Sequence, residues 1–124
     1  MKRLLLGVST AVGFMASAPA QSADPSSFVG VWCSGTLYHF DSRSIELTIA
    51  TVNDGVAFGQ YVLRGPGRID TSISGTVSGS DLSVVVDVDV SLHLALRDGK
   101  LDGTLSDKGA GRRWNVTLTK KVVC

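Results

Sequence analysis

Hydrophobic and polar residues alternate along most of the chain after residue 28. The clearest case is the segment 45–51, in which Ile45, Leu47 and Ile49 fall on one face, with Glu46 and Thr48 between them. A period of two is typical of β-strands with one buried face, whereas helices repeat apolar residues every three to four positions. The pattern therefore predicts an all-β domain with no helix beyond residue 27.

Turn sequences separate the alternating segments. The tripeptides at 53–55 (Asn-Asp-Gly) and 79–81 (Gly-Ser-Asp) and the pair at 98–99 (Asp-Gly) contain residues that tolerate positive φ, so they favour hairpins. Looser breaks follow at 64–67 and 106–111. Outside the segment 82–97, the predicted strands are 28–38, 45–51, 56–63, 69–77, 101–105 and 112–122.

The segment 82–97 alternates without a break in phase and is longer than an ordinary strand. We expect two strands that meet near residues 87–89, with one long bent strand as the alternative. The domain then has seven or eight short strands in sequential hairpins. This arrangement favours a small antiparallel up-and-down barrel, because closure removes exposed strand edges. A β-sandwich is the second choice.

The first residues have the features of a signal peptide. Lys2 and Arg3 precede an apolar stretch at 4–15, and residues 18–20 (Ala-Pro-Ala) are the small residues that a signal peptidase recognises. The stretch is too short to span a bilayer, which takes about 20 residues. We therefore expect a bacterial product that is periplasmic or secreted, with a signal peptide at 1–20, a flexible lead-in at 21–27 and a single domain at 28–124.

Both cysteines, Cys33 and Cys124, lie in this exported part. An even number of cysteines in an exported chain favours a disulfide bond. Cys33 falls in the first predicted strand and Cys124 is the last residue, which suits a barrel whose first and last strands are antiparallel neighbours. Such a bond leaves no thiol for chemistry.

Two stretches resemble calycins, the group that includes lipocalins and avidins. Residues 30–32 (Gly-Val-Trp) are similar to the G-x-W element of the first calycin strand, and residues 47–61 look like the second hairpin of an avidin barrel. The resemblance implies that Trp32 packs across the closed end of the barrel under an arginine of the last strand, here Arg112 or Arg113. It does not extend to a biotin site, because the chain has only two tryptophans.

Three aromatic residues, Trp32, Phe58 and Tyr61, are candidates for the wall of an interior cavity. Leucine and valine supply the rest of the predicted interior, so a cavity there would take a small apolar ligand. The alternative is that these aromatic residues are ordinary members of the core.

A polar group is predicted at Asp87, Asp89 and His93, because these odd-numbered residues share a face if 82–97 is one strand. Two carboxylates and an imidazole on one face suit a divalent cation or a polar ligand. The alternative is a solvated outer face, and a turn near 87–89 would separate the three residues. We therefore assign neither a metal site nor a cofactor.

Charge and motifs argue against several functions. Without Lys2 and Arg3, the 12 basic residues of the chain fall to 10, against 11 acidic ones, and such a balance does not favour nucleic-acid binding. The predicted strands are short for a membrane-spanning barrel. The sequence contains no nucleophile elbow, zinc-ligand spacing or phosphate loop, which argues against an enzyme.

The leading hypothesis is a non-catalytic binding protein that takes either a small apolar ligand inside the barrel or a protein partner at its loops. The alternative is an inhibitor or host-directed effector that acts through its loops. Basic residues near the C-terminus suit an acidic partner, or serve only solubility; they are Lys108, Arg112, Arg113, Lys120 and Lys121. An interior cavity above about 300 Å³ would favour the ligand, and a packed interior would favour the partner.

Overall fold

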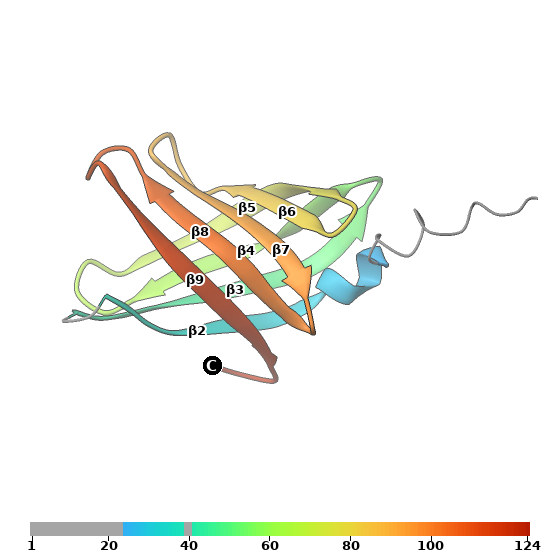
Figure 1. Ribbon diagram of the computed structural model, residues 1–124, viewed down its shortest axis with the longest axis horizontal. Coiled ribbons are helices and arrows are strands. Elements are labelled where there is room, and N and C mark those ends of the chain that lie inside the picture. The colour runs from blue at the N-terminus through green and yellow to red at the C-terminus, as the bar shows by residue number, and fades with distance from the viewer. Residues whose placement is uncertain (1–23, 39–40) are drawn as a thin grey trace, which may run out of the picture.

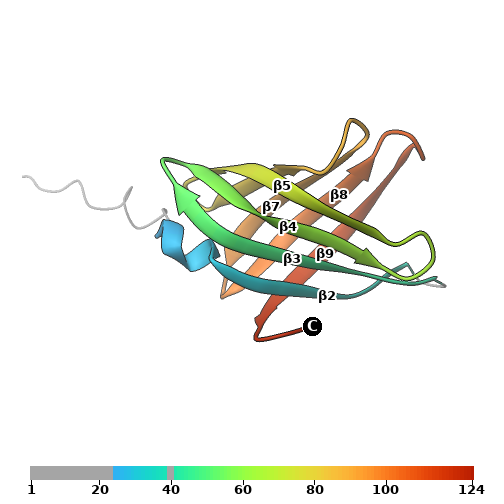
Figure 2. The ribbon, with the colours of Figure 1, turned by 180° about the vertical axis from the view of Figure 1, so that it is seen from behind.

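The computed structural model describes residues 24–38 and 41–124, except for the side chains of residues 36–42. The predicted signal peptide at 1–20 and the start of the lead-in at 21–23 lie outside the described residues. Most of the described chain forms eight antiparallel strands (Figures 1 and 2). They are β2 (Gly30–Tyr38), β3 (Asp41–Asn53), β4 (Val56–Arg64), β5 (Ile69–Ser78), β6 (Asp81–Val85), β7 (Val90–Arg97), β8 (Lys100–Asp107) and β9 (Arg112–Lys121).

The strands close into a single up-and-down barrel. Each strand pairs with its neighbour in the chain, and β9 completes the ring by pairing with β2, where Trp32 stands opposite Lys120. The predicted all-β antiparallel barrel is confirmed, and the β-sandwich is not formed. Hydrogen bonding around the ring leaves no open edge among these strands.

The segment 82–97 is divided between β6 and β7, as expected. Asp87 stabilises the turn between them, because its Oδ1 accepts hydrogen bonds from the backbone N–H of Asp89 at 2.8 Å and of Val90 at 2.9 Å. An aspartate at such a position offers the backbone an alternative to the strand ladder. The single long bent strand is therefore excluded.

A short 3-10 helix, η3 (Pro25–Phe28), precedes the barrel and overlaps the end of the lead-in predicted at 21–27. Asp24 caps η3 by accepting a hydrogen bond from the N–H of Ser26 at 3.0 Å. Phe28 is fully buried, and its carbonyl accepts a hydrogen bond from Trp32 Nε1 at 2.8 Å. A single turn is too short to show a helical period, so the alternation pattern did not reveal it.

The two ends of the barrel therefore differ. The end that η3 covers, where the turns after β3, β5 and β7 also lie, is called the closed end below. The opposite end carries the connections after β4, β6 and β8 and is called the loop end. Both ends can be followed in Figure 1.

Apolar side chains from alternate strand positions meet inside the barrel. Burying such side chains gives about 1.5–3 kcal/mol each before entropy is counted, so this cluster is the main source of stability. The cluster includes Phe28, Trp32, Ile45, Leu47, Ile49, Ala57, Tyr61, Leu63, Ile73, Leu82, Val84, Leu92, Leu94, Leu101, Leu105, Val116 and Leu118.

Cys33 and Cys124 form a disulfide bond, as predicted, with their Cα atoms 5.7 Å apart and their positions separated by 91 in the sequence. Cys33 lies on β2 opposite Thr119 of β9, and the segment after β9 turns back to bring Cys124 beside β2 (Figure 1). The bond therefore joins the first and last strands of the ring. Across the part of the chain that is described, no helix is both long and apolar enough to cross a membrane.

Candidate functional site

Trp32 organises the closed end of the barrel. Its ring is almost completely buried, and Lys120 Nζ lies 5.0 Å from the ring centroid. Lys120 also donates a hydrogen bond to the carbonyl of Ser27 at 3.2 Å. Both side chains thus hold η3 against the barrel, which is a structural role.

The cation over Trp32 was predicted to be Arg112 or Arg113, and this prediction is wrong. The register between β2 and β9 determines which cation lies over the Trp32 ring, because Trp32 is paired with Lys120. Arg112 and Arg113 begin β9 at the loop end, and a strand rises about 3.3 Å per residue, so both start roughly 25 Å from Trp32 along the strand.

Of the three candidates for a cavity wall, two lie in the interior and one does not. Trp32 and Tyr61 are each 1% exposed, whereas Phe58 is 50% exposed. Side chains on a strand alternate between faces, so Phe58 and Tyr61, three positions apart on β4, point to opposite sides. Phe58 therefore stands on the outer wall, and Trp32 and Tyr61 are members of the core cluster.

Three hollows lie on the outside of the barrel. The first, of about 430 Å³, is lined by Ser106, Arg113 and the β8–β9 loop. The second, of about 340 Å³, follows the outer wall of β6, β7 and β8. The third, of about 310 Å³, lies between the outer wall and the β6–β7 loop. These hollows lie outside the buried core cluster.

The predicted polar group of Asp87, Asp89 and His93 is divided by the turn. The two aspartates lie in the loop, and His93 lies on β7, where its Nδ1 is 3.3 Å from Ser83 Oγ. All three residues still line the hollow of about 310 Å³. Within 24–38 and 41–124, no group of three or more His, Cys, Asp or Glu residues is arranged to hold a metal ion.

The loops after β6 and β8 pack against each other. The backbone N–H of Lys108 donates a hydrogen bond to the carbonyl of Asp89 at 2.9 Å. At Gly109 a Cβ would lie only 3.1 Å from Asp89 Oδ2, so the two loops are in close contact. We call residues 85–90 and 106–113 together the loop platform. Its two loops support each other, which gives the loop end a defined surface.

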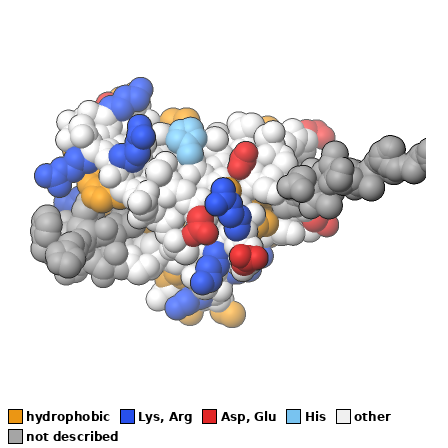
Figure 3. All heavy atoms as spheres, viewed as in Figure 1, with side chains coloured by type: hydrophobic (Ala, Val, Ile, Leu, Met, Phe, Trp, Pro, Cys, Tyr) orange, Lys and Arg blue, Asp and Glu red, His pale blue; other side chains and the backbone are white. Residues whose placement is uncertain are grey.

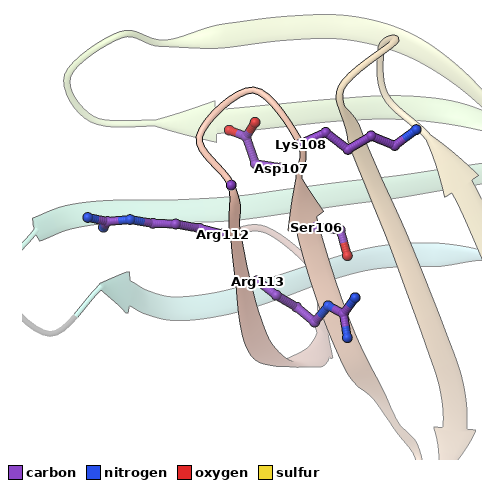
Figure 4. A pocket seen from close by; sticks show the side chains of 6 residues that line it. Ser106, Asp107, Lys108, Arg112 and Arg113 are labelled. Atoms are coloured by element: carbon purple, nitrogen blue, oxygen red, sulfur yellow. The ribbon is translucent and has the colours of Figure 1, made fainter.

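Apolar and cationic side chains are exposed on the loop platform. Val85 is 65% exposed and Val88 is 88% exposed, and both line the hollow of about 310 Å³. Lys108, Arg112 and Arg113 line the hollow of about 430 Å³ (Figure 4). Figure 3 shows lysine and arginine side chains gathered at the barrel end that β8 and β9 form.

Comparisons with known proteins give this surface no precedent. No protein-family model matches the chain, and neither a curated protein nor a solved structure is significantly similar to it. The function is therefore inferred from the geometry of the barrel and its loops.

Proposed function

We propose that this protein is a non-catalytic binding protein that engages a protein partner through the loop platform. The observation that carries the proposal is the position of the concave surface. Two hollows, of about 430 and 310 Å³, adjoin at Lys108 on the platform, whereas the interior holds the core cluster. Partner binding of this kind includes the action of an inhibitor or a host-directed effector.

Exposed valine supports this choice. Large apolar side chains on a surface are a cost in water unless a partner covers them, and contiguous exposed apolar groups mark interaction sites. Val85 and Val88 are three positions apart, and both line the hollow of about 310 Å³. Their loop is held by the Asp87 turn, so a partner meets a preformed surface and loses less entropy on binding.

A small apolar ligand inside the barrel receives less support. Trp32 and Tyr61, two of the aromatic residues expected to line a cavity, are packed into the core, and Phe58 faces outward. Native mass spectrometry of the protein from its own cells distinguishes the two ideas. We expect the mass of the bare chain, and a constant mass increment from a bound small molecule would favour the interior ligand.

Among the described residues, Ser83 and His93 are the pair that best suits an enzymatic role. Their 3.3 Å contact lies on the outer wall, where His93 is exposed. Nucleophilic catalysis also needs a group that orients the imidazole and donors that stabilise an oxyanion. The nearby Asp102 accepts a hydrogen bond from Thr117 Oγ1 at 2.6 Å, so its carboxylate is engaged elsewhere. The contact between Ser83 and His93 therefore gives little support to nucleophilic catalysis.

We infer further that the mature protein is exported and that its barrel is of the calycin type. The Cys33–Cys124 bond suits an oxidising compartment. The buried Trp32 beneath a cation at the closed end agrees with the arrangement that the G-x-W resemblance implied. The cation is Lys120 in place of an arginine.

Site-specific photo-crosslinking tests the proposed function. A photoreactive residue replaces Val88 on the platform or, as a control, Val122, an equally exposed valine beyond the last strand (88% and 96% exposed). We expect one adduct of discrete mass from position 88 in the cells of origin. The partner identified from that adduct should bind the purified protein and lose affinity on Val88→Asp. Equal adducts from both positions, or none from position 88, would refute the platform.

A further inference from the structure

The cations of the loop platform differ from those of the β4–β5 connection at the same end of the barrel. Arg64 is paired with Glu46, and Arg68 Nη2 lies 3.5 Å from Asp70 Oδ2. Lys108, Arg112 and Arg113 have no ion pair with any residue in the described part of the chain. Their charge is therefore available to a partner.

Two of the three aspartates of the platform accept hydrogen bonds from its own backbone, and the third, Asp89, lines the hollow of about 310 Å³. Asp107 Oδ1 accepts a hydrogen bond from the N–H of Ala110 at 3.0 Å. Asp87 Oδ1 accepts two, from the N–H groups of Asp89 and Val90. Because Asp107 bonds to the turn that carries it, the side chains of Lys108, Arg112 and Arg113 reach further from the loop than its carboxylate does (Figure 4).

The directions of the basic side chains select the kind of partner. Arg112 and Arg113 extend to opposite sides of β9, and Lys108 extends over the neighbouring hairpin (Figure 4). Side chains of adjacent residues on a strand point to opposite faces, so the two guanidinium groups cannot both bind the same small anion. A chain segment with several carboxylates can meet all three cations at once.

The hollow that Val85 and Val88 line indicates a second property of the partner, an apolar side chain. Lys108 lines both hollows, so the cationic surface continues directly into the surface formed by Val85 and Val88. An apolar side chain placed over these valines would remove them from water, which stabilises a complex by about 25 cal/mol per Å² of apolar area buried. The neighbouring cations would meet carboxylates that flank this side chain.

We propose that the loop platform recognises an acidic segment of a partner protein that also carries an exposed apolar side chain. This inference rests on the proposed function and specifies the chemistry of the partner. The apolar side chain covers Val85 and Val88, and the carboxylates pair with Lys108, Arg112 and Arg113. Opposite charges across such an interface mainly speed association and set specificity.

A random dodecapeptide library displayed on phage tests the proposal with the intact, disulfide-bonded protein as bait. We expect the selected peptides to be enriched in Asp and Glu beside a large apolar residue. Synthetic copies should lose affinity by about tenfold or more for the Arg112→Glu, Arg113→Glu double variant. Their binding should also weaken as salt is added.

The matched control is the double variant Lys100→Glu, Lys121→Glu, which makes the same change in charge at the closed end. It should bind the peptides as the wild type does. An Arg112→Gln, Arg113→Gln variant gives the same comparison with a smaller change in charge, and thermal melts confirm that each variant is folded.

Two negative outcomes separate this inference from the proposed function. If the selected peptides are not acidic, yet Val88→Asp abolishes their binding, the inference is wrong and the platform remains the binding surface. If neither the Val88 nor the arginine variants change binding, the peptides bind elsewhere, and both the inference and the platform are refuted.

Discussion

Gly103 on β8 lies against the backbone of β7, with no room for a side chain between them. A Cβ at this position would be 1.8 Å from the carbonyl oxygen of His93, far inside the contact distance of any two atoms. A Cβ at Gly59 on β4 would likewise lie 1.7 Å from the carbonyl oxygen of Thr48 on β3. Glycine at these positions allows the strands to coil tightly enough to close a small barrel.

We predict that Gly103→Ala destabilises the protein by about 1–3 kcal/mol or more, because the added methyl group forces the β7 and β8 backbones apart. The change is measured as a lower midpoint of urea unfolding. Gly35→Ala is the matched control, since a Cβ at Gly35 meets no described atom within 4 Å. Equal midpoints for the two variants would show that the close approach at Gly103 is unimportant.

The burial of an individual side chain could be predicted where it follows from the alternation along a strand alone. The alternation at Ile45, Leu47 and Ile49 correctly gives three buried residues. The prediction for Phe58 was wrong because it grouped residues three apart, although parity on β4 already places Phe58 opposite Tyr61. The partner of Trp32 needed the register between β2 and β9, which no local pattern contains.

At the scale of elements, the β6–β7 connection shows how one carboxylate divides an alternating segment. The apolar pattern continues through residues 82–97, so strand propensity alone favours one strand. The bonds from Asp87 Oδ1 to two backbone N–H groups, at 2.8 and 2.9 Å, satisfy donors that the ladder would otherwise use. The turn then brings Val88 to the surface of the platform.

We predict that Asp87→Ala costs about 1–2 kcal/mol of stability, since two backbone donors lose their acceptor. Hydrogen exchange provides the local readout, with the amides of Asp89 and Val90 exchanging faster. Asp87→Asn, which keeps an acceptor oxygen, should restore most of their protection. Unchanged exchange in Asp87→Ala would mean that the turn is held by other contacts.

At the scale of the whole molecule, the ring and the Cys33–Cys124 bond support each other. The bond joins positions 91 residues apart. Cross-linking such distant positions limits the conformations of the unfolded chain, and the chain-entropy model gives roughly 4–5 kcal/mol for a loop of this size. This is a large fraction of the stability of a small domain, which is about 5–15 kcal/mol.

We predict that the double variant Cys33→Ser, Cys124→Ser has a markedly lower melting temperature than the oxidised wild type. Chemical reduction of the wild type should produce the same fall, which separates loss of the cross-link from an effect of serine itself. If oxidised, reduced and variant proteins melt together, the bond contributes little to stability.

The barrel was predictable from the sequence because hairpin turns and alternation are local signals, and a chain of sequential hairpins has few arrangements available. The loop platform was only partly predictable. The loop at 106–111 and its basic residues were identified, but the hydrogen bond from Lys108 to Asp89 joins loops that lie apart in the sequence. The predicted shared face of Asp87, Asp89 and His93 depended on one continuous strand, and the turn divides it, although all three residues line one hollow.

The pairing of β9 with β2 has a consequence for how quickly the chain reaches its native state. Seven of the eight strand pairs join neighbours in the chain, and each forms by closing a short loop. The eighth brings together residues as distant as Val31 and Lys121, so its loop-closure entropy is the largest. Because such non-local contacts slow folding, we expect the pairing of β9 with β2 to be the rate-limiting step. In an unfolded chain that keeps the Cys33–Cys124 bond, the segments that form β2 and β9 are already held close together. Pairing them then costs less entropy, so such a chain should refold faster.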